Sequence, residues 1–196
     1  MNEKPKGRVY SDVTQAVDEV LEYVGKDIVF AMPLALGKPV RFINELYQRA
    51  KEDPSIRLRI LTALPLEKPK GKSELERRLL RTILPRLFDG VPDIDYMMDY
   101  RDGTMPPNVE AYEFFSKAGC YLNDPVAQQN HIASNYTHVV RDAFDMGVNV
   151  FSNLIGFRED EKGLTYSMGC NTDICIEGIQ EVEKRRQQGH KIMLIG

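Results

Sequence analysis

The run from Asp27 to Met32 constrains the fold more than any other part of the sequence, because nearly every residue in it is apolar. A strand that faces water on one side alternates apolar and polar residues, whereas a strand covered on both faces does not. The run therefore predicts a buried strand of a parallel sheet. A helix beginning at Pro39 and a second strand over 57–63 follow it, and strand, helix, strand is a βαβ unit.

The same alternation continues along the chain and predicts an α/β fold, with a mainly parallel open sheet and helices on both faces. A helix capped by Ser11 and closed by Gly25 precedes the first strand, and Ser73 opens an amphipathic helix. The segment 88–107 reads as irregular and acidic. The remaining expected elements are a short helix over 112–117, a helix over 137–146, a strand over 148–155, a helix over 173–188 and a strand over 192–195.

Composition excludes several classes of protein. The 196 residues suit one domain, and 26 basic against 29 acidic residues leave a net charge of −3, which argues against a nucleic-acid partner. No apolar window is long enough to cross a membrane, and the charged residues 1–6 do not resemble a secretory signal. Three cysteines make a disulfide framework unexpected. We therefore expect a cytoplasmic protein.

Ligands of open parallel sheets bind beyond the carboxyl ends of the strands, which points first to the segment 32–39. Its backbone amides could face an acyl oxygen or a phosphate. The alternative is an ordinary loop between a strand and a helix. The segment is neither a P-loop nor a dinucleotide fingerprint, because Pro39 follows Gly37-Lys38 and no G-x-G-x-x-G is present.

Two further segments carry polar side chains that could contact a ligand. The segment 128–138 is dense in amide, hydroxyl and imidazole groups, although Ser134 or Asn135 could simply cap the next helix. His131 and His138 lack a third ligand at a telling spacing, so no metal site is expected. In the segment 166–173, asparagine, threonine and aspartate could cap a helix or reach a ligand. Cys170 and Cys175 are expected to be small buried residues. The acidic residues of 89–102 are expected to form a solvated surface. Arg77, Arg78 and Arg81 are expected to lie on the solvent-exposed face of a helix.

The last residues, 190–196, read as a buried strand after a helix that closes at Gly189. Domain ends are more often polar, so this pattern suggests a piece of a longer protein. The alternative is an edge or swapped strand at a natural terminus.

Several phrases resemble the amino-terminal half of the acetyl-CoA hydrolase/transferase family, which belongs to the class I coenzyme A transferases and includes 4-hydroxybutyrate CoA-transferase. The resemblance runs from about Ser11 to Gly196, is strongest at PLALGKP and SNYTHV, and includes a small hairpin at 162–167. It implies the NagB/RpiA/CoA transferase-like architecture. The phrases are FAMPLALGKPVRFINELYQRA, ILTALPLEKP, MPPNVEAYEFF and QQNHIASNYTHVVRDAFDMGVNVF.

The resemblance also implies an activity. Family members transfer CoA between carboxylic acids or hydrolyse acyl-CoA, through a glutamate that forms a glutamyl-CoA thioester. That glutamate lies in the family's carboxyl-terminal half, so no catalytic residue is assigned in this chain, and the chain alone is expected to be inactive. The residues expected to face the substrate are Pro33, Leu34, Ala35, Gly37, Ser134 and Asn135.

The expected partners follow from the same resemblance. They are an acyl-CoA, a small carboxylic acid and the protein's own carboxyl-terminal domain, with coenzyme A as substrate and no cofactor. Weak CoA binding is expected, because half a cleft buries only part of a ligand. An exposed cleft face would favour a homo-oligomer. The alternative is a stand-alone α/β module that binds a ligand or regulates and has no chemistry of its own.

Overall fold

The computed structural model describes residues 7–161 and 163–196; residues 1–6, for which no secretory signal is predicted, lie outside the described part. A five-stranded sheet forms its centre, and every pair of neighbouring strands in it is parallel. The predicted α/β class with a mainly parallel open sheet is confirmed. Across the sheet the strands are β3 (Val109–Glu113), β2 (Arg57–Thr62), β1 (Asp27–Ala31), β4 (Val150–Ser152) and β7 (Met193–Ile195).

Helices cover both faces of the sheet, as the apolar run of β1 predicts. Ile28 and Phe30 belong to one buried cluster, whereas Val29 and Ala31 belong to a second cluster on the opposite face. Successive side chains of a strand point to opposite faces, so β1 has to be apolar throughout. The first cluster is covered by α1 (Val13–Val24), α2 (Val40–Glu52) and α4 (Asp95–Asp102), and the second by α6 (Val139–Asp145) and α7 (Thr172–Gln187).

Local signals set most helix ends. The cap of α1 is Asp12, one residue after the expected Ser11, because its carboxylate accepts the amide of Thr14 at 3.0 Å. Gly25 ends that helix with a φ of 85°. Ser73 caps α3 (Glu74–Leu87) as predicted, in a capping box with Glu76.

Two predicted elements are wrong. The segment expected to be a helix over 112–117 begins inside strand β3, which pairs with β2 from Leu58↔Val109 to Thr62↔Glu113. Its local pattern is ambiguous, and pairing with a neighbouring strand decides it. The segment expected to be irregular and solvated contains α4, whose Asp99 accepts the hydroxyl of Tyr47 and the ammonium of Lys51, both at 2.7 Å.

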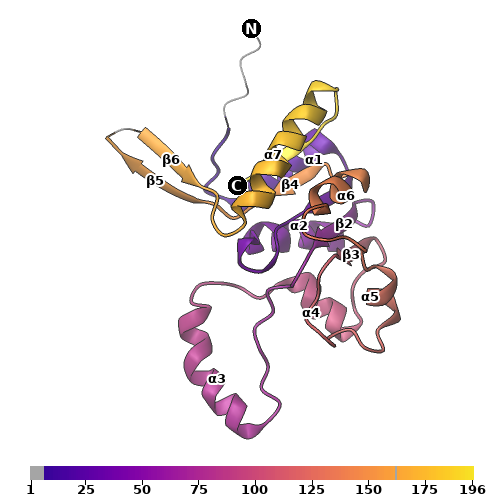
Figure 1. The fold of residues 1–196 in the computed structure, drawn as a ribbon, viewed down its shortest axis with the longest axis vertical. Helices are drawn as coiled ribbons and strands as arrows, with labels where there is room; N and C mark the ends of the chain where they lie inside the picture. The colour runs from indigo at the N-terminus through magenta and orange to yellow at the C-terminus, as the bar shows by residue number, and fades with distance from the viewer. Residues whose placement is uncertain (1–6, 162) are drawn as a thin grey trace.

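Two parts of the chain stand apart from the sheet in Figure 1. One is α3, which has no buried residue. The other is a hairpin of β5 (Gly156–Asp160) and β6 (Gly163–Ser167), all of whose described residues are exposed. This hairpin confirms the expectation for 162–167, although Lys162 at its turn lies outside the described residues. The short elements η1 (Ala35–Gly37) and α5 (Pro125–Gln129) complete the fold.

Some expectations about burial are corrected. The strand at 193–195 forms, but it lies at the edge of the sheet and is only partly buried. Cys175 is buried as expected, whereas Cys170 is exposed because it lies in the turn before α7. None of the helices within residues 7–161 and 163–196 is long and apolar enough to cross a membrane.

Candidate functional site

The order of the strands places a switch point between β1 and β4. From β1 the chain builds the sheet outward through β2 to β3, and it later returns to pair β4 with the other side of β1 and then adds β7. The connections leaving β1 and β4 therefore diverge to opposite sides of the sheet. In open parallel sheets this divergence opens a crevice at the carboxyl ends of the two strands, where ligands bind.

The loop that leaves β1 is fastened to segments far away in the sequence. The carbonyl oxygen of Gly37 accepts the amide of Leu154 at 2.8 Å, just after β4. The carbonyl oxygen of Leu34 accepts Nδ2 of Asn171, the residue before α7, at 3.3 Å. A Cβ at Gly37 would collide with Asn171 and lie 2.8 Å from Cβ of Pro33, so only glycine fits. The first and third predicted segments therefore meet at the switch point.

The second predicted segment joins the same edge. The hydroxyl of Tyr136 donates to the carboxylate of Asp173 at 3.0 Å, which links the loop before α6 to the first turn of α7. The hydroxyl of Ser134 donates to the carbonyl of Asn135 at 3.2 Å, and Ser134 and Arg141 together lower the pKa of the Asp142 carboxyl. All three segments that the sequence singles out thus lie together at the carboxyl ends of the strands.

A small cavity, which we call the strand-end pocket, lies between these segments. Its volume is about 50 Å³; the first two segments line it through Pro33 and Ile132, and α7, which begins within the third segment, lines it through Ile174. The lining is almost entirely apolar. The other lining residues are Ala31, Met32, Leu61, Thr62, Phe114, Val139, Val140, Asp142, Ala143 and Phe151.

Lys38 lies buried beside this pocket and ties two strand-end loops together. Its Nζ donates to the carbonyl of Pro33 at 2.6 Å, to the hydroxyl of Thr62 at 2.7 Å and to the carbonyl of Ala63 at 2.7 Å. These three acceptors match the three N–H groups of an ammonium. Burial nevertheless lowers the pKa of Lys38 to about 7, opposed only in part by the attraction of Glu113.

Backbone strain gathers at the same edge. Ala35 and Leu64 have positive φ values of 47° and 44°, in the loops that leave β1 and β2. The amide of Ala35 donates to the carbonyl of Leu64 at 3.2 Å, so the two strained residues contact each other. Side chains other than glycine rarely adopt this conformation, and such residues cluster at functional sites.

Buried polar groups also mark the carboxyl edge. Asn153, directly after β4, is 5% exposed; its Nδ2 donates to the carbonyl of Met168 at 2.7 Å, and its Oδ1 has no partner among the described residues. Glu113 ends β3, and burial raises the pKa of its carboxyl. One oxygen of Glu113 accepts the hydroxyl of Tyr121 at 2.8 Å, while Oε2 has no partner in the described part of the chain. Unpaired buried oxygens are costly, so a ligand or water is expected to satisfy them.

The predicted site residues fall into three groups. Pro33 lines the strand-end pocket, and Ser134 contacts its rim through Asp142. Leu34, Ala35 and Gly37 lie beside it at the switch point, where the amides of Ala35 and Gly37 already donate to backbone carbonyls of the strand-end loops. Asn135 is exposed, and its side chain accepts the hydroxyl of Thr137 at 2.7 Å. Contact between these residues and a substrate stays a prediction.

The expected helix caps differ from those observed. His138, not Ser134 or Asn135, is the residue before α6, and it makes no capping bond through its side chain. Asn171 precedes α7 and likewise does not cap it, because its amide is engaged by the loop after β1. Within residues 7–161 and 163–196 no cluster of three or more His, Cys, Asp or Glu side chains could hold a metal ion.

Sequence reasoning missed Lys38, Thr62 and Asn153. The sequence does carry a signal for Lys38, because this lysine stands between a glycine and a proline in the loop after a buried strand. Thr62 and Asn153 carry no distinctive pattern, because each is a single polar residue at the end of a strand.

Comparisons with known proteins give a likeness in fold. No protein-family model and no curated protein matches the chain. Two solved structures of RipA, each of a point mutant, are similar to it, with 15% identity and a TM-score of 0.43, and 17% identity and a TM-score of 0.42. Each match covers 76% of this chain and 31% of the RipA chain. The chain thus spans about a third of the RipA chains that it resembles.

Proposed function

We propose that this chain is the amino-terminal domain of an enzyme that transfers CoA between carboxylic acids or hydrolyses acyl-CoA. One observation carries the proposal: the three segments that the sequence singles out meet at the switch point of the sheet, and the two that resemble the acetyl-CoA hydrolase/transferase family most strongly line one pocket there. These segments are separated by up to 137 residues along the chain. A shared site explains why the resemblance is strongest at PLALGKP and SNYTHV.

The strand-end pocket suits the acyl group of the substrate. Its lining is apolar apart from Thr62 and Asp142, and the hydroxyl of Thr62 is already engaged by Lys38. A volume of about 50 Å³ exceeds the roughly 30 Å³ that one water occupies in the liquid, so it holds only a few heavy atoms. We infer that a short acyl group, such as acetyl, enters this pocket with the thioester at its mouth.

The chemical step belongs to a glutamate that we place in a second domain outside this chain. Its carboxylate would attack the thioester carbonyl and expel the CoA thiolate, which leaves a mixed anhydride. The thiolate would then attack the glutamyl carbonyl of the anhydride, releasing the acyl group as a carboxylate and forming a glutamyl-CoA thioester. The residues described here would position the acyl group and exclude water from it. We propose that the carboxyl-terminal domain and a small carboxylic acid are the partners, and that the enzyme works in the cytoplasm.

Nuclear magnetic resonance with acetyl-pantetheine tests the proposal, because this thioester carries the acyl group and lacks the nucleotide of CoA. We expect chemical-shift changes at the amides of 33–37, 134–136 and 171–174 at millimolar concentration. The matched control is pantetheine without the acetyl group, which should move these amides less. Shift changes confined to other parts of the chain, or equal changes with both compounds, would favour a binding module without this chemistry.

A further inference from the structure

A basic groove lies on the segment 68–88, which we call the α3 arm. Seven lysine and arginine residues and two glutamates fall in this segment, so it carries an excess of five positive charges on a chain whose net charge is −3. The rest of the chain is therefore strongly acidic. Such a local reversal of charge is typical of a surface that attracts an anion.

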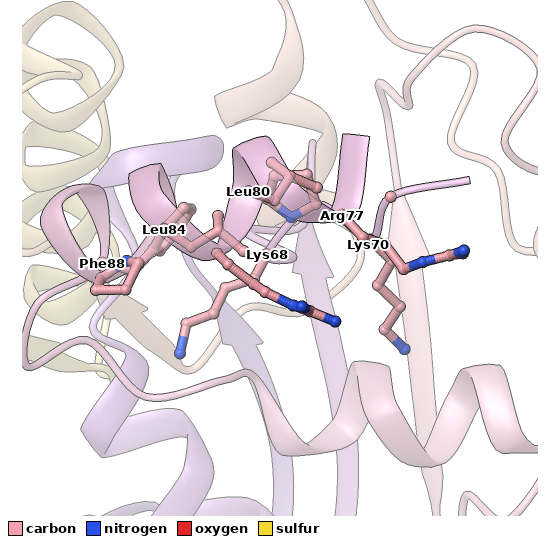
Figure 2. Close-up of a pocket in the computed structure, with 10 residues that line it drawn as sticks. Lys68, Lys70, Arg77, Leu80, Leu84 and Phe88 are labelled. Carbon is pink, nitrogen blue, oxygen red and sulfur yellow. The ribbon is translucent and has the colours of Figure 1, made fainter. Parts of the chain in front are cut away.

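The groove runs between the loop 68–71 and one side of α3, and its volume is about 610 Å³. Leu80, Leu84 and Phe88 give it an apolar floor. Figure 2 shows Lys68, Lys70 and Arg77 reaching out on the same side of the helix. Arg81 is the fourth basic residue of the lining.

Two of these cations have carboxylate partners and two do not. Lys68 lies 3.5 Å from Asp93, and Arg77 lies 3.2 Å from Glu74. Lys70 and Arg81 have no ion pair or hydrogen bond within the described part of the chain. Like charges gathered on one groove repel one another, so an anion that binds there relieves the repulsion.

The size and chemistry of the groove indicate which kind of anion it can bind. The groove is wide and open to solvent, and its volume of about 610 Å³ leaves room for a small molecule. Its apolar floor ends at the ring of Phe88, over which Nζ of Lys68 lies 5.9 Å from the ring centroid. A ligand that carries phosphates and a flat apolar part fits this groove. The phosphates would pair with the lysines and arginines, and the apolar part would pack on the apolar floor.

Larger partners fit less well. A second copy of the arm carries the same charge and would be repelled. A membrane surface or a nucleic acid is negatively charged over an area larger than the groove, so the acidic remainder of the chain opposes its approach. We propose that the α3 arm binds a nucleoside diphosphate or a ligand that contains one, at a site separate from the strand-end pocket. The proposal does not depend on the proposed function.

Isothermal titration with ADP tests the proposal on the whole chain. We expect saturable binding with a Kd of about 1 mM or tighter, weaker binding of adenosine and of pyrophosphate, and loss of affinity as salt rises. The combined substitution Lys70→Ala and Arg81→Ala should weaken ADP binding by about tenfold or more. Phe88→Ala should weaken ADP and leave pyrophosphate within about twofold.

The matched control is Arg78→Ala, which removes an exposed arginine of α3 that does not line the groove. Circular dichroism checks that each variant keeps the helix content of the wild type. Absence of ADP binding up to about 5 mM, or equal weakening by Arg78→Ala, would overturn the proposal. Tight binding to vesicles that contain phosphatidylserine, without ADP binding, would overturn it in favour of a membrane surface.

Discussion

Replacing Lys38 with methionine should destabilise the protein in a pH-dependent way. Methionine keeps much of the volume and removes the hydrogen bonds of Nζ, which at pH 9 is a neutral amine that donates two of the three. After the substitution, the carbonyl of Pro33 still accepts a hydrogen bond from the hydroxyl of Thr62 at 3.2 Å. The carbonyl of Ala63 keeps only a long hydrogen bond from the amide of Ala35 at 3.4 Å. A buried acceptor left without a good partner costs about 1–3 kcal/mol, so we expect a loss of about 2–4 kcal/mol at pH 9.

The sign of the pH dependence follows from the lowered pKa. Burial lowers the pKa of Lys38 from 10.5 to about 7, so between these values the unfolded chain binds a proton that the folded chain does not. The stability that this lysine contributes is complete above pH 10.5 and is lost as pH falls through 7. Each pKa unit corresponds to about 1.4 kcal/mol, so the wild type should gain about 2–3 kcal/mol over the variant between pH 7 and 9.

Urea unfolding at several pH values, followed by circular dichroism and tyrosine fluorescence, measures this difference; the chain has nine tyrosines and no tryptophan. The control is Lys70→Met, which removes an exposed lysine from the α3 arm and should leave the pH dependence unchanged. A difference between wild type and Lys38→Met that stays constant or shrinks from pH 7 to 9 would refute the reasoning.

Four further results are expected. Gly37→Ala should lower the free energy of unfolding by about 2–4 kcal/mol in urea titrations, because the new Cβ would collide with Asn171; Gly156→Ala, with 3.9 Å to its nearest neighbour, should cost less. Tyr136→Phe should cost only about 0.5–1.5 kcal/mol, since its bond to Asp173 is exposed. Amides of α3 should exchange with deuterium far faster than those of β1, because α3 has no buried residue. Acyl-CoA assays of the chain alone should show no turnover; turnover lost on mutating a residue of this chain would contradict the proposed division of labour.

The sequence was sufficient to predict the α/β sheet because the relevant signals are local. The apolar run of β1 and the helical spacing of α2 each depend on neighbours a few residues away. Strand β3 was mispredicted because its identity depends on pairing with β2, about fifty residues earlier. The acidic side chains of α4 resemble a solvated surface, yet Tyr96 and Met97 between them are buried.

The candidate site was located in part. The rule for strand ends identified the three segments, but their meeting around one pocket depends on the order of the strands. The strain at Ala35 and Leu64 and the buried position of Lys38 arise where the loop after β1 meets the loop after β2. These features come from tertiary contacts, so no local sequence pattern predicts them.

For the α3 arm, a local pattern predicted the helix but not its surroundings. Ser73 and the amphipathic spacing predicted the helix and its exposed arginines correctly. Such a pattern does not say whether the apolar side is covered, and in the structure Leu75 is 77% exposed. The basic groove is therefore visible only once the loop 68–71 is seen beside the helix.

A crystal structure of the chain soaked with acetyl-pantetheine would show where the acyl group binds. We expect the acetyl group in the strand-end pocket, between Pro33, Ile132 and Ile174, with the thioester at the switch point of β1 and β4. Thioester density at any other place on the chain, with the strand-end pocket left unchanged, would contradict this expectation.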